Sequence, residues 1–398
     1  MTDRDKMDIT FTPQQQAYRE QVRSWLAENL PSNWTQGGLW PAQSEEAEQE
    51  LLIDWERRLY AAGYSGIAWP KDYGGQGRDH VDDLIVNEEL GAASAPESIN
   101  TIGRELVAPI ILSVGTEEQK RHYVPRILRM DDTWCQGFSE PNAGSDLASI
   151  KTRARRSGDK WIINGQKIWT SYAHFANHCI LLARTNMDVS PYRGMSLFIV
   201  KMETPGIEVR PIRHMNGLRH FNEVFFTDVE IDDGMLIGPL DTGWKVAVEV
   251  LGFERATTRL YRQARFTEEL RALVDYALDA DDVGDALRAE IGGIVAELSI
   301  MRYHNLRFIS RLSSGARIGE EASFLKLLWS NLHQKIARLA LELLGPEFDA
   351  LSPIAERFRR IYFTSRGETI YAGSSQIQRN ILAERVLGLP RGERRVGQ

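Results

Sequence analysis

The chain contains 398 residues, of which 42% are hydrophobic and 26% charged, a composition typical of globular proteins and a length that predicts two or three domains. Its net charge of −7 argues against nucleic acid as the main partner, and the only two cysteines are too few for a disulfide framework. No apolar run reaches the about 18 residues of a membrane span, and no His/Cys cluster has the spacing of metal ligands. We therefore expect a cytoplasmic protein without a metal.

The first third of the chain has helical periodicity. Thr12 and Pro13 supply a capping hydroxyl and a first-turn proline for a helix that continues to about Pro31. Apolar side chains at helical spacing predict further helices at residues 51–62, 82–93, 104–113 and 116–130. A loop rich in glycine separates the first two of these. Together they predict an all-helical domain over residues 1–131.

The period of the apolar residues changes from about 3.6 to 2 after Trp134. Short runs, mostly apolar, β-branched or aromatic, predict strands at residues 154–156, 160–163, 180–184, 195–200, 207–211 and 222–229. Asn164-Gly165 favours a hairpin turn after the second run. Many short strands without intervening helices predict a central β-barrel or sandwich domain at residues 132–240.

From Trp244 the pattern is again helical. Amphipathic segments predict helices at residues 244–251, 256–278, 285–311, 322–344 and 375–387. Long amphipathic helices pack as bundles, so we expect a C-terminal four-helix bundle at residues 241–398 and an α+β protein of three domains. The wide apolar faces also predict a homo-oligomer, either a homodimer or a homotetramer.

Three stretches combine glycines, hydroxyls and aromatic rings. Residues 136–146 form a turn in which Ser139 and Ser145 offer short donors, although an ordinary tight loop has the same composition. Residues 164–171 place Trp169 beside the hydroxyls of Thr170 and Ser171, and a buried core tryptophan is the alternative interpretation. Residues 370–380, near the C-terminus, form the third stretch.

In this order the three stretches resemble the flavin-binding segments of the acyl-CoA dehydrogenase family, and the resemblance covers about residues 11–391. It implies FAD as cofactor, a CoA thioester as substrate and an electron-transferring flavoprotein as electron acceptor. Phe138 and Ser139 would hold the pyrimidine edge of the flavin, and Trp169 would lie against its ring system. The implied cofactor-binding residues are Phe138, Ser139, Trp169, Thr170, Ser171, Ser374, Ser375 and Gln376; the implied substrate-binding residues are Ser145, Arg255 and Gly373.

Removal of two hydrogens beside a thioester needs a base, a hydride acceptor and donors for the developing oxyanion. Many family members carry the basic Glu directly before the glycine of the third stretch, where this chain has Ala372. The chain resembles the minority with the base on an earlier helix, as in isovaleryl- and long-chain-type enzymes, which implies Glu254. A surface carboxylate paired with Arg255 or Arg259 is the alternative. The backbone N–H of residue 372 remains available as an oxyanion donor.

The chain departs from the family pattern where a neighbouring subunit would contact FAD. Residues 280–284 are acidic where a pyrophosphate would favour a cation, and Glu342 and Pro346 replace a glutamine and a glycine. Such divergence resembles bacterial members that act on steroid side chains or dicarboxylates, some of them hetero-oligomers with a related subunit. A flavin oxidase and a non-catalytic subunit that stabilises an active homologue therefore remain alternatives.

Overall fold

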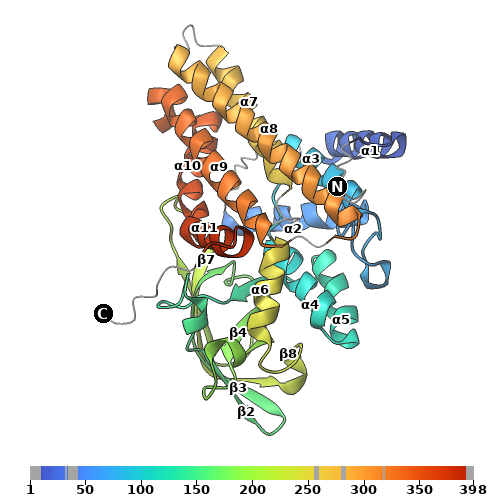
Figure 1. The fold of residues 1–398 in the computed structure, drawn as a ribbon, viewed down its shortest axis with the longest axis vertical. Coiled ribbons are helices and arrows are strands. Elements are labelled where there is room, and N and C mark those ends of the chain that lie inside the picture. Colours follow the sequence, from blue (N-terminus) through green and yellow to red (C-terminus); the bar gives the residue numbers. More distant parts are fainter. Residues whose placement is uncertain are drawn as a thin grey trace. The chain divides into compact units, whose positions relative to one another are not determined.

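The structure is a computed structural model that describes residues 10–31, 34, 44–254, 260–278, 284–316 and 319–390, with residues 249–254 described by their backbone alone. Helices, then strands, then helices follow one another along the chain, which confirms the predicted α–β–α order (Figure 1). In the described part, no helix is both long and apolar enough to cross a membrane, and no group of His, Cys, Asp and Glu side chains is arranged to hold a metal.

The first helix begins where the sequence predicts. In α1 (Pro13–Asn29) the Thr12 hydroxyl accepts from the Gln15 N–H at 3.2 Å, and the Gln15 side chain accepts from the Thr12 N–H at 2.9 Å. This reciprocal capping box satisfies two N–H groups that the helix itself leaves free. The other predicted helices of this region are present with shifted ends as α2 (Glu45–Ala61), α3 (His80–Ala92), α4 (Ala108–Val114) and α5 (Glu117–Leu128).

The chain forms two compact units that do not follow the order of the sequence. One unit combines residues 1–41, 79–96 and 255–398, and the other combines residues 42–78 and 97–254. In the first unit, Arg19 of α1 bonds Glu88 and Glu89 of α3 at 2.6 and 2.8 Å. The helices that we predicted as one N-terminal domain are therefore shared between the two units.

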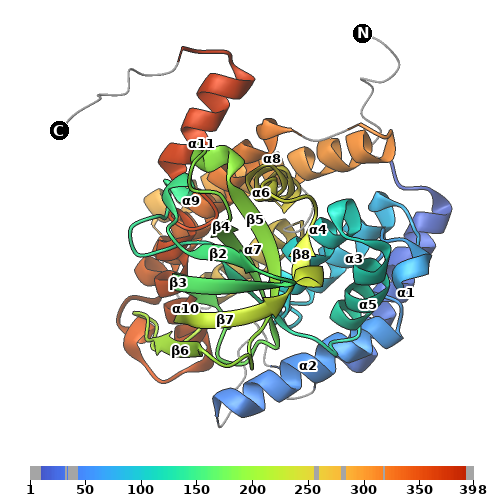
Figure 2. The same ribbon diagram turned by 90° about the horizontal axis from the view of Figure 1, so that it is seen from below.

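Eight strands form one mixed sheet in the second unit. Its order is β6-β7-β3-β2-β4-β5-β8, and β1 pairs with β4; the pairs β1/β4 and β2/β4 are parallel and the others antiparallel (Figure 2). The strands are β1 (Trp134–Gly137), β2 (Arg153–Ser157), β3 (Lys160–Ser171), β4 (His178–Arg184), β5 (Met195–Lys201), β6 (Ile207–Ile212), β7 (Phe221–Asp232) and β8 (Leu236–Ile237).

The predicted hairpin at Asn164-Gly165 is wrong. Strand β3 runs straight through this pair, and the turn before it lies at residues 158–159, because Ser157 pairs with Lys160. Gly165 instead marks a register shift against β7. A Cβ atom at Gly165 would lie 2.4 Å from the Thr152 hydroxyl, so the absence of a side chain at this position allows β3 to approach Thr152 closely.

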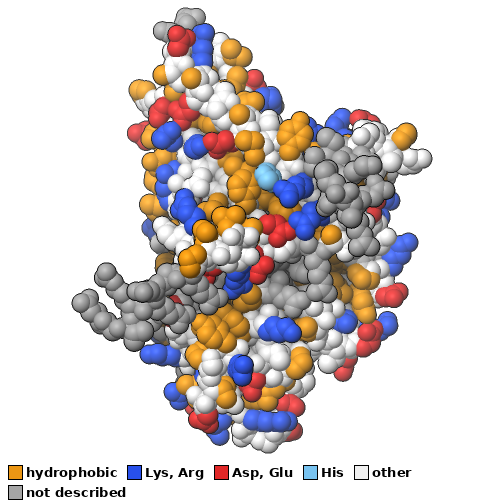
Figure 3. All heavy atoms as spheres, in the orientation of Figure 1, with side chains coloured by type: hydrophobic (Ala, Val, Ile, Leu, Met, Phe, Trp, Pro, Cys, Tyr) orange, Lys and Arg blue, Asp and Glu red, His pale blue; other side chains and the backbone are white. Residues whose placement is uncertain are grey.

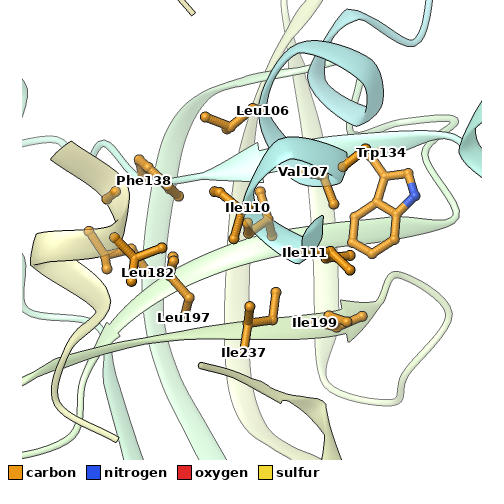
Figure 4. Close-up of a cluster of buried hydrophobic side chains, with 14 of the residues drawn as sticks. Leu106, Val107, Ile110, Ile111, Trp134, Phe138, Leu182, Leu197, Ile199 and Ile237 are labelled. Carbon is orange, nitrogen blue, oxygen red and sulfur yellow. The ribbon is translucent and has the colours of Figure 1, made fainter. Parts of the chain in front are cut away.

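The core of the sheet unit links a helix to the first glycine-rich stretch. A π-helical turn, Gly103–Val107, leads directly into α4. Figure 4 shows Leu106 and Ile110 of this segment directed toward Leu182 on the sheet, with Phe138 in the same cluster. Burial of such side chains contributes roughly 1.5–3 kcal/mol each. The residue that follows β1 is thus fixed by the core.

The C-terminal helices confirm the predicted bundle. Helices α7 (Tyr261–Leu278), α8 (Asp285–Ser313), α9 (Ser323–Leu344) and α10 (Pro353–Glu368) pack side by side around a shared apolar core, while α6 (Gly243–Glu254) belongs to the sheet unit (Figure 1). Helix α10 was not predicted. The last predicted helix is present as α11 (Ser375–Ile381) followed by a π-helical turn. On the face drawn in Figure 3, cationic and anionic side chains of the described residues are interspersed.

Candidate active site

The chain after β1 is held against the second stretch. Gly137 ends β1, and a Cβ atom there would lie 2.9 Å from the Leu181 side chain and 3.0 Å from the Cys179 sulfur. Phe138 follows and is buried, and Ser139 is half-buried. The Ser139 carbonyl accepts a hydrogen bond from the Ile168 N–H at 2.9 Å. The first two predicted flavin-binding stretches therefore adjoin each other.

A buried ion pair that sequence reasoning missed fixes this junction. The Lys167 ammonium lies 2.9 Å from both the Phe138 carbonyl and a Glu140 carboxylate oxygen. The same carboxylate accepts from the N–H groups of Lys151 and Thr152 at 2.6 and 2.9 Å, which closes the loop. The signal was available, because Lys167 occupies an inward position in the strand alternation of β3.

The charges of this pair stabilise each other. Burial alone would raise the pKa of Glu140, but Lys167 and the hydrogen bonds from Thr152 and Lys151 hold it below its usual value. Burial lowers the pKa of Lys167 to about 8 although Glu140 opposes the shift. Lys167 thus titrates in an accessible pH range, where loss of its proton would weaken the junction.

Trp169 is presented on the surface of the described structure rather than in the core. It is 57% exposed, so the alternative of a buried core tryptophan is wrong. Its backbone has a φ of +60°, and the pairing of β3 with β7 shifts register between Lys167 and Thr170. The indole meets the edge of Phe221 at a centroid distance of 6.1 Å. A non-glycine residue in this conformation is strained, and such residues concentrate at functional sites.

The hydroxyl residues of the first two stretches lie in different environments. Thr170 is fully buried, and its hydroxyl has no hydrogen-bond partner within the described ranges, while its carbonyl accepts from Asn222 at 3.0 Å. Ser171 is half-buried at the end of β3, and Ser145 lies on an exposed turn. An exposed indole, neighbouring hydroxyls and a glycine-lined backbone turn fit a planar, polar-edged ring system such as a flavin.

The third stretch forms a turn in the other unit. Ala372 and Gly373 have φ values of +52° and +81°, and the Ser375 N–H donates to the Thr369 carbonyl at 3.0 Å. Ser374 caps α11, its hydroxyl accepting from the Ile377 N–H at 3.4 Å; Ser375 is buried and Gln376 exposed. The N–H of Ala372 makes no hydrogen bond to any described residue.

The predicted base and its neighbours are only partly described. Glu254 is the last residue of α6, and its side chain lies outside the described part, as do Arg255, Arg259 and residues 280–283. Glu342 is exposed and lies 3.6 Å from Arg338, and Pro346 belongs to a short 3-10 turn, Gly345–Asp349. The predicted residues Phe138, Ser139, Ser145, Trp169, Thr170 and Ser171 share the sheet unit, and Gly373, Ser374, Ser375 and Gln376 belong to the bundle unit.

Comparison with known proteins places the chain in a family. Family models of the acyl-CoA dehydrogenase N-terminal, middle and C-terminal domains match residues 12–131, 135–229 and 241–387. The chain is 40% identical over 380 residues to acyl-CoA dehydrogenase IpdE1 of Mycobacterium tuberculosis, covering 94% of this chain and 97% of that protein.

Solved structures agree with this assignment. The Tcur3481-Tcur3483 steroid ACAD superposes with a TM-score of 0.82 at 27% identity, and the ChsE4-ChsE5 complex from Mycobacterium tuberculosis with 0.81 at 30%. Each covers 97% of this chain and 100% of the matched chain. The chain belongs to the acyl-CoA dehydrogenase family of FAD-dependent oxidoreductases.

Proposed function

We propose that this protein converts an acyl-CoA thioester to the trans-2-enoyl-CoA. The observation that carries the proposal is Trp169, which is exposed and held at positive φ beside Thr170 and Ser171 in a chain of this family. A tryptophan with only a core-packing role would be buried. An aromatic plate beside hydroxyl donors suits the ring system of FAD, which supplies the hydride acceptor when bound.

We assign the cofactor contacts on the same basis. Phe138 and Ser139 follow β1 at a junction fixed by Lys167, so their backbone is suited to hold one edge of a ring. Trp169 and Ser171 would face the ring system, and the buried Thr170 between them would hold this part of β3 in place. Ser374, Ser375 and Gln376, at the start of α11, are further proposed cofactor contacts.

Glu254 is our proposed base for the α-proton. By the family resemblance, Ala372 stands where many members carry the carboxylate, and an alanine cannot accept a proton. Glu254 is the last residue of α6, and the resemblance to the isovaleryl-type branch implies it as the base. The Ala372 N–H, which bonds no described residue, would donate to the thioester oxygen and lower the pKa of the α-proton. Ser145, Arg255 and Gly373 are the proposed substrate contacts.

We infer that the acyl group is derived from a steroid and that a related subunit takes part. The structural neighbour named a steroid ACAD and the two-protein ChsE4-ChsE5 complex support both points, as do the substitutions at Glu342 and Pro346. The electrons would pass to an electron-transferring flavoprotein. A flavin oxidase is the second candidate in the enzyme class.

The test is an anaerobic screen of the purified protein, alone and with a related subunit, against straight, branched, dicarboxyl and steroid-type CoA thioesters. We expect loss of flavin absorbance with a steroid-type thioester and formation of the 2-enoyl product. A protein that binds no flavin under either condition, or flavin that no thioester bleaches, would favour the non-catalytic subunit. Rapid reoxidation by oxygen in place of the flavoprotein acceptor would favour the oxidase.

A further inference from the structure

The turn between α10 and α11 contains two consecutive left-handed residues. Gly373, at φ +81°, adopts this conformation freely, but Ala372, at φ +52°, carries a Cβ atom that disfavours it. A strained residue persists only where its surroundings hold it in place. The contacts around Ala372 therefore identify what maintains the turn.

The side chain of Gln378, in α11, forms hydrogen bonds to this turn. Its side chain is fully buried, and its Nε2 donates to the Ala372 carbonyl at 2.9 Å and to the Gly373 carbonyl at 3.4 Å. A Cβ atom at Gly373 would lie 2.4 Å from this nitrogen, so the contact is close. The Oε1 of Gln378 has no hydrogen-bond partner among the described residues. A buried amide whose oxygen stays unpaired destabilises the fold, which indicates a role beyond packing.

The residues just before the turn are hydrogen-bonded to the bundle helices. The Tyr371 N–H donates to the Gly367 carbonyl at 3.0 Å, which fixes the chain just before Ala372. Gln334 of α9 donates to the Thr369 hydroxyl at 3.2 Å, and His333 of α9 donates to the Glu368 carboxylate at 2.7 Å. On the other side of the turn the Ser375 N–H donates to the Thr369 carbonyl at 3.0 Å, and between these anchors Gln378 holds the Ala372 and Gly373 carbonyls.

We propose that Gln378 is a positioning residue for the thioester oxygen. By anchoring the Ala372 carbonyl it keeps Ala372 left-handed, and the N–H of the same residue, joined through one Cα atom, is then directed as a fixed donor. The inference rests on the proposed function, since the donor acts on a thioester. Preorganised donors stabilise a developing oxyanion more than donors that must reorient.

Gln378→Met tests this, because methionine keeps the length of the side chain and removes the donor. We expect the rate of flavin bleaching by a good thioester to fall by about 10²–10³-fold, the usual cost of losing an oxyanion donor, with little change in thioester affinity. The infrared carbonyl stretch of a bound, unreactive thioester should move back toward its value in water. Gln16→Met, the same substitution at an exposed position of α1, is the matched control and should leave both readouts unchanged.

Should Gln378→Met fail to fold, Gln378→Leu gives the same test, because its shorter apolar side chain also has no donor. A folded variant of either kind with the wild-type bleaching rate and carbonyl frequency would overturn the inference. A wild-type protein that no thioester bleaches would instead remove the proposed function.

Discussion

Lys167 is a fully buried cation whose two hydrogen bonds, to Phe138 and Glu140, join the first two predicted flavin-binding stretches. Removing one partner of a buried ion pair leaves the other charge without compensation. We predict that Lys167→Met lowers the free energy of unfolding by about 3–5 kcal/mol and weakens FAD retention, measured by urea denaturation and by the bound flavin absorbance. Lys151→Met is the control, because its side chain is exposed and its N–H bond to Glu140 remains.

The double variant Lys167→Met/Glu140→Leu sharpens this prediction. It removes both charges, so it should lose less stability than Lys167→Met alone. A single variant within about 1 kcal/mol of the wild type would show that the pair does not hold the junction together.

The proposed role of Glu254 as the base also depends on a single side chain. Glu254→Gln keeps the shape of the side chain and removes its basicity. We predict that anaerobic flavin reduction by a good thioester slows by about 10²–10⁴-fold, the usual loss on removing a general base. FAD content and thioester affinity should change little, since neither needs that charge. A variant that bleaches as fast as the wild type would exclude Glu254 as the base.

At the scale of elements, local signals predicted most helices and misread two segments. The capping box of α1 and the apolar periodicity of α9 are local, so the sequence alone predicted both. Asn164-Gly165 has the composition of a turn, but it lies inside β3, where the neighbouring Thr152 requires the glycine. That requirement comes from a residue distant along the chain. Helix α10 was missed although Ser352 and Pro353 provide a cap and a first turn.

The residues of the candidate site also divide into those that the sequence predicted and those that it did not. The composition of the three glycine- and hydroxyl-rich stretches predicted the segments that contain Ser139, Trp169 and Ala372. The exposure of Trp169 and the positive φ values of Trp169 and Ala372 depend on the tertiary structure. Lys167 has only its inward position in β3 as a local signal and Gln378 has no distinctive local pattern, because folding brings near them the carbonyl groups that they contact. The Glu254 side chain lies outside the described part, so its role stays a prediction.

Helices α7, α9 and α10 meet at a buried charged cluster. His333 lies 2.7 Å from Glu368 and 3.3 Å from Glu269, and the Phe266 ring stacks on it at 4.3 Å. Arg262 lies 3.5 Å from Glu368. Burial alone would lower the pKa of His333, but Glu368 and Glu269 raise it to about 10 from an ordinary value of 6.5.

The raised pKa sets the sign of a pH dependence. The folded state binds the His333 proton more tightly than the unfolded state, so this contribution is complete below pH 6.5 and disappears as pH rises through about 10. We predict that His333→Gln loses about 3–5 kcal/mol of unfolding free energy at pH 6, and that the difference from wild type shrinks toward pH 10. Urea denaturation of both proteins across this range measures it; a difference that grows with pH would contradict it.

At the scale of the whole molecule, contiguous domains were the natural prediction from sequence. The predicted boundaries at residues 131 and 240 remain predictions, but the compact units combine α1 and α3 with the C-terminal bundle. Such pairing joins segments more than fifty residues apart, which local periodicity does not reveal. The family assignment, by contrast, extends over nearly the whole chain.

The bundle also presents an apolar face that argues for assembly. Ala296, Ile300 and Tyr303 recur at helical spacing on α8 and are exposed, Ile300 by 46% and Tyr303 by 56%. Apolar stripes of this kind are usually covered by a partner. We predict that the protein forms a stable oligomer at micromolar concentration, with itself or with a related subunit, and that Ile300→Asp shifts it toward smaller species in light scattering because the new charge would be desolvated at the interface.

Leu351→Asp is the matched control for this charge, because Leu351 is fully exposed on the turn before α10 and has no apolar stripe beside it. It should leave the mass unchanged. A wild-type protein that stays monomeric, alone and after mixing with a related subunit, would contradict assembly. An oligomer that both aspartate variants leave intact would show that the interface does not include this face of α8. Loss of mass in Ile300→Asp alone would assign the α8 face to the subunit contact.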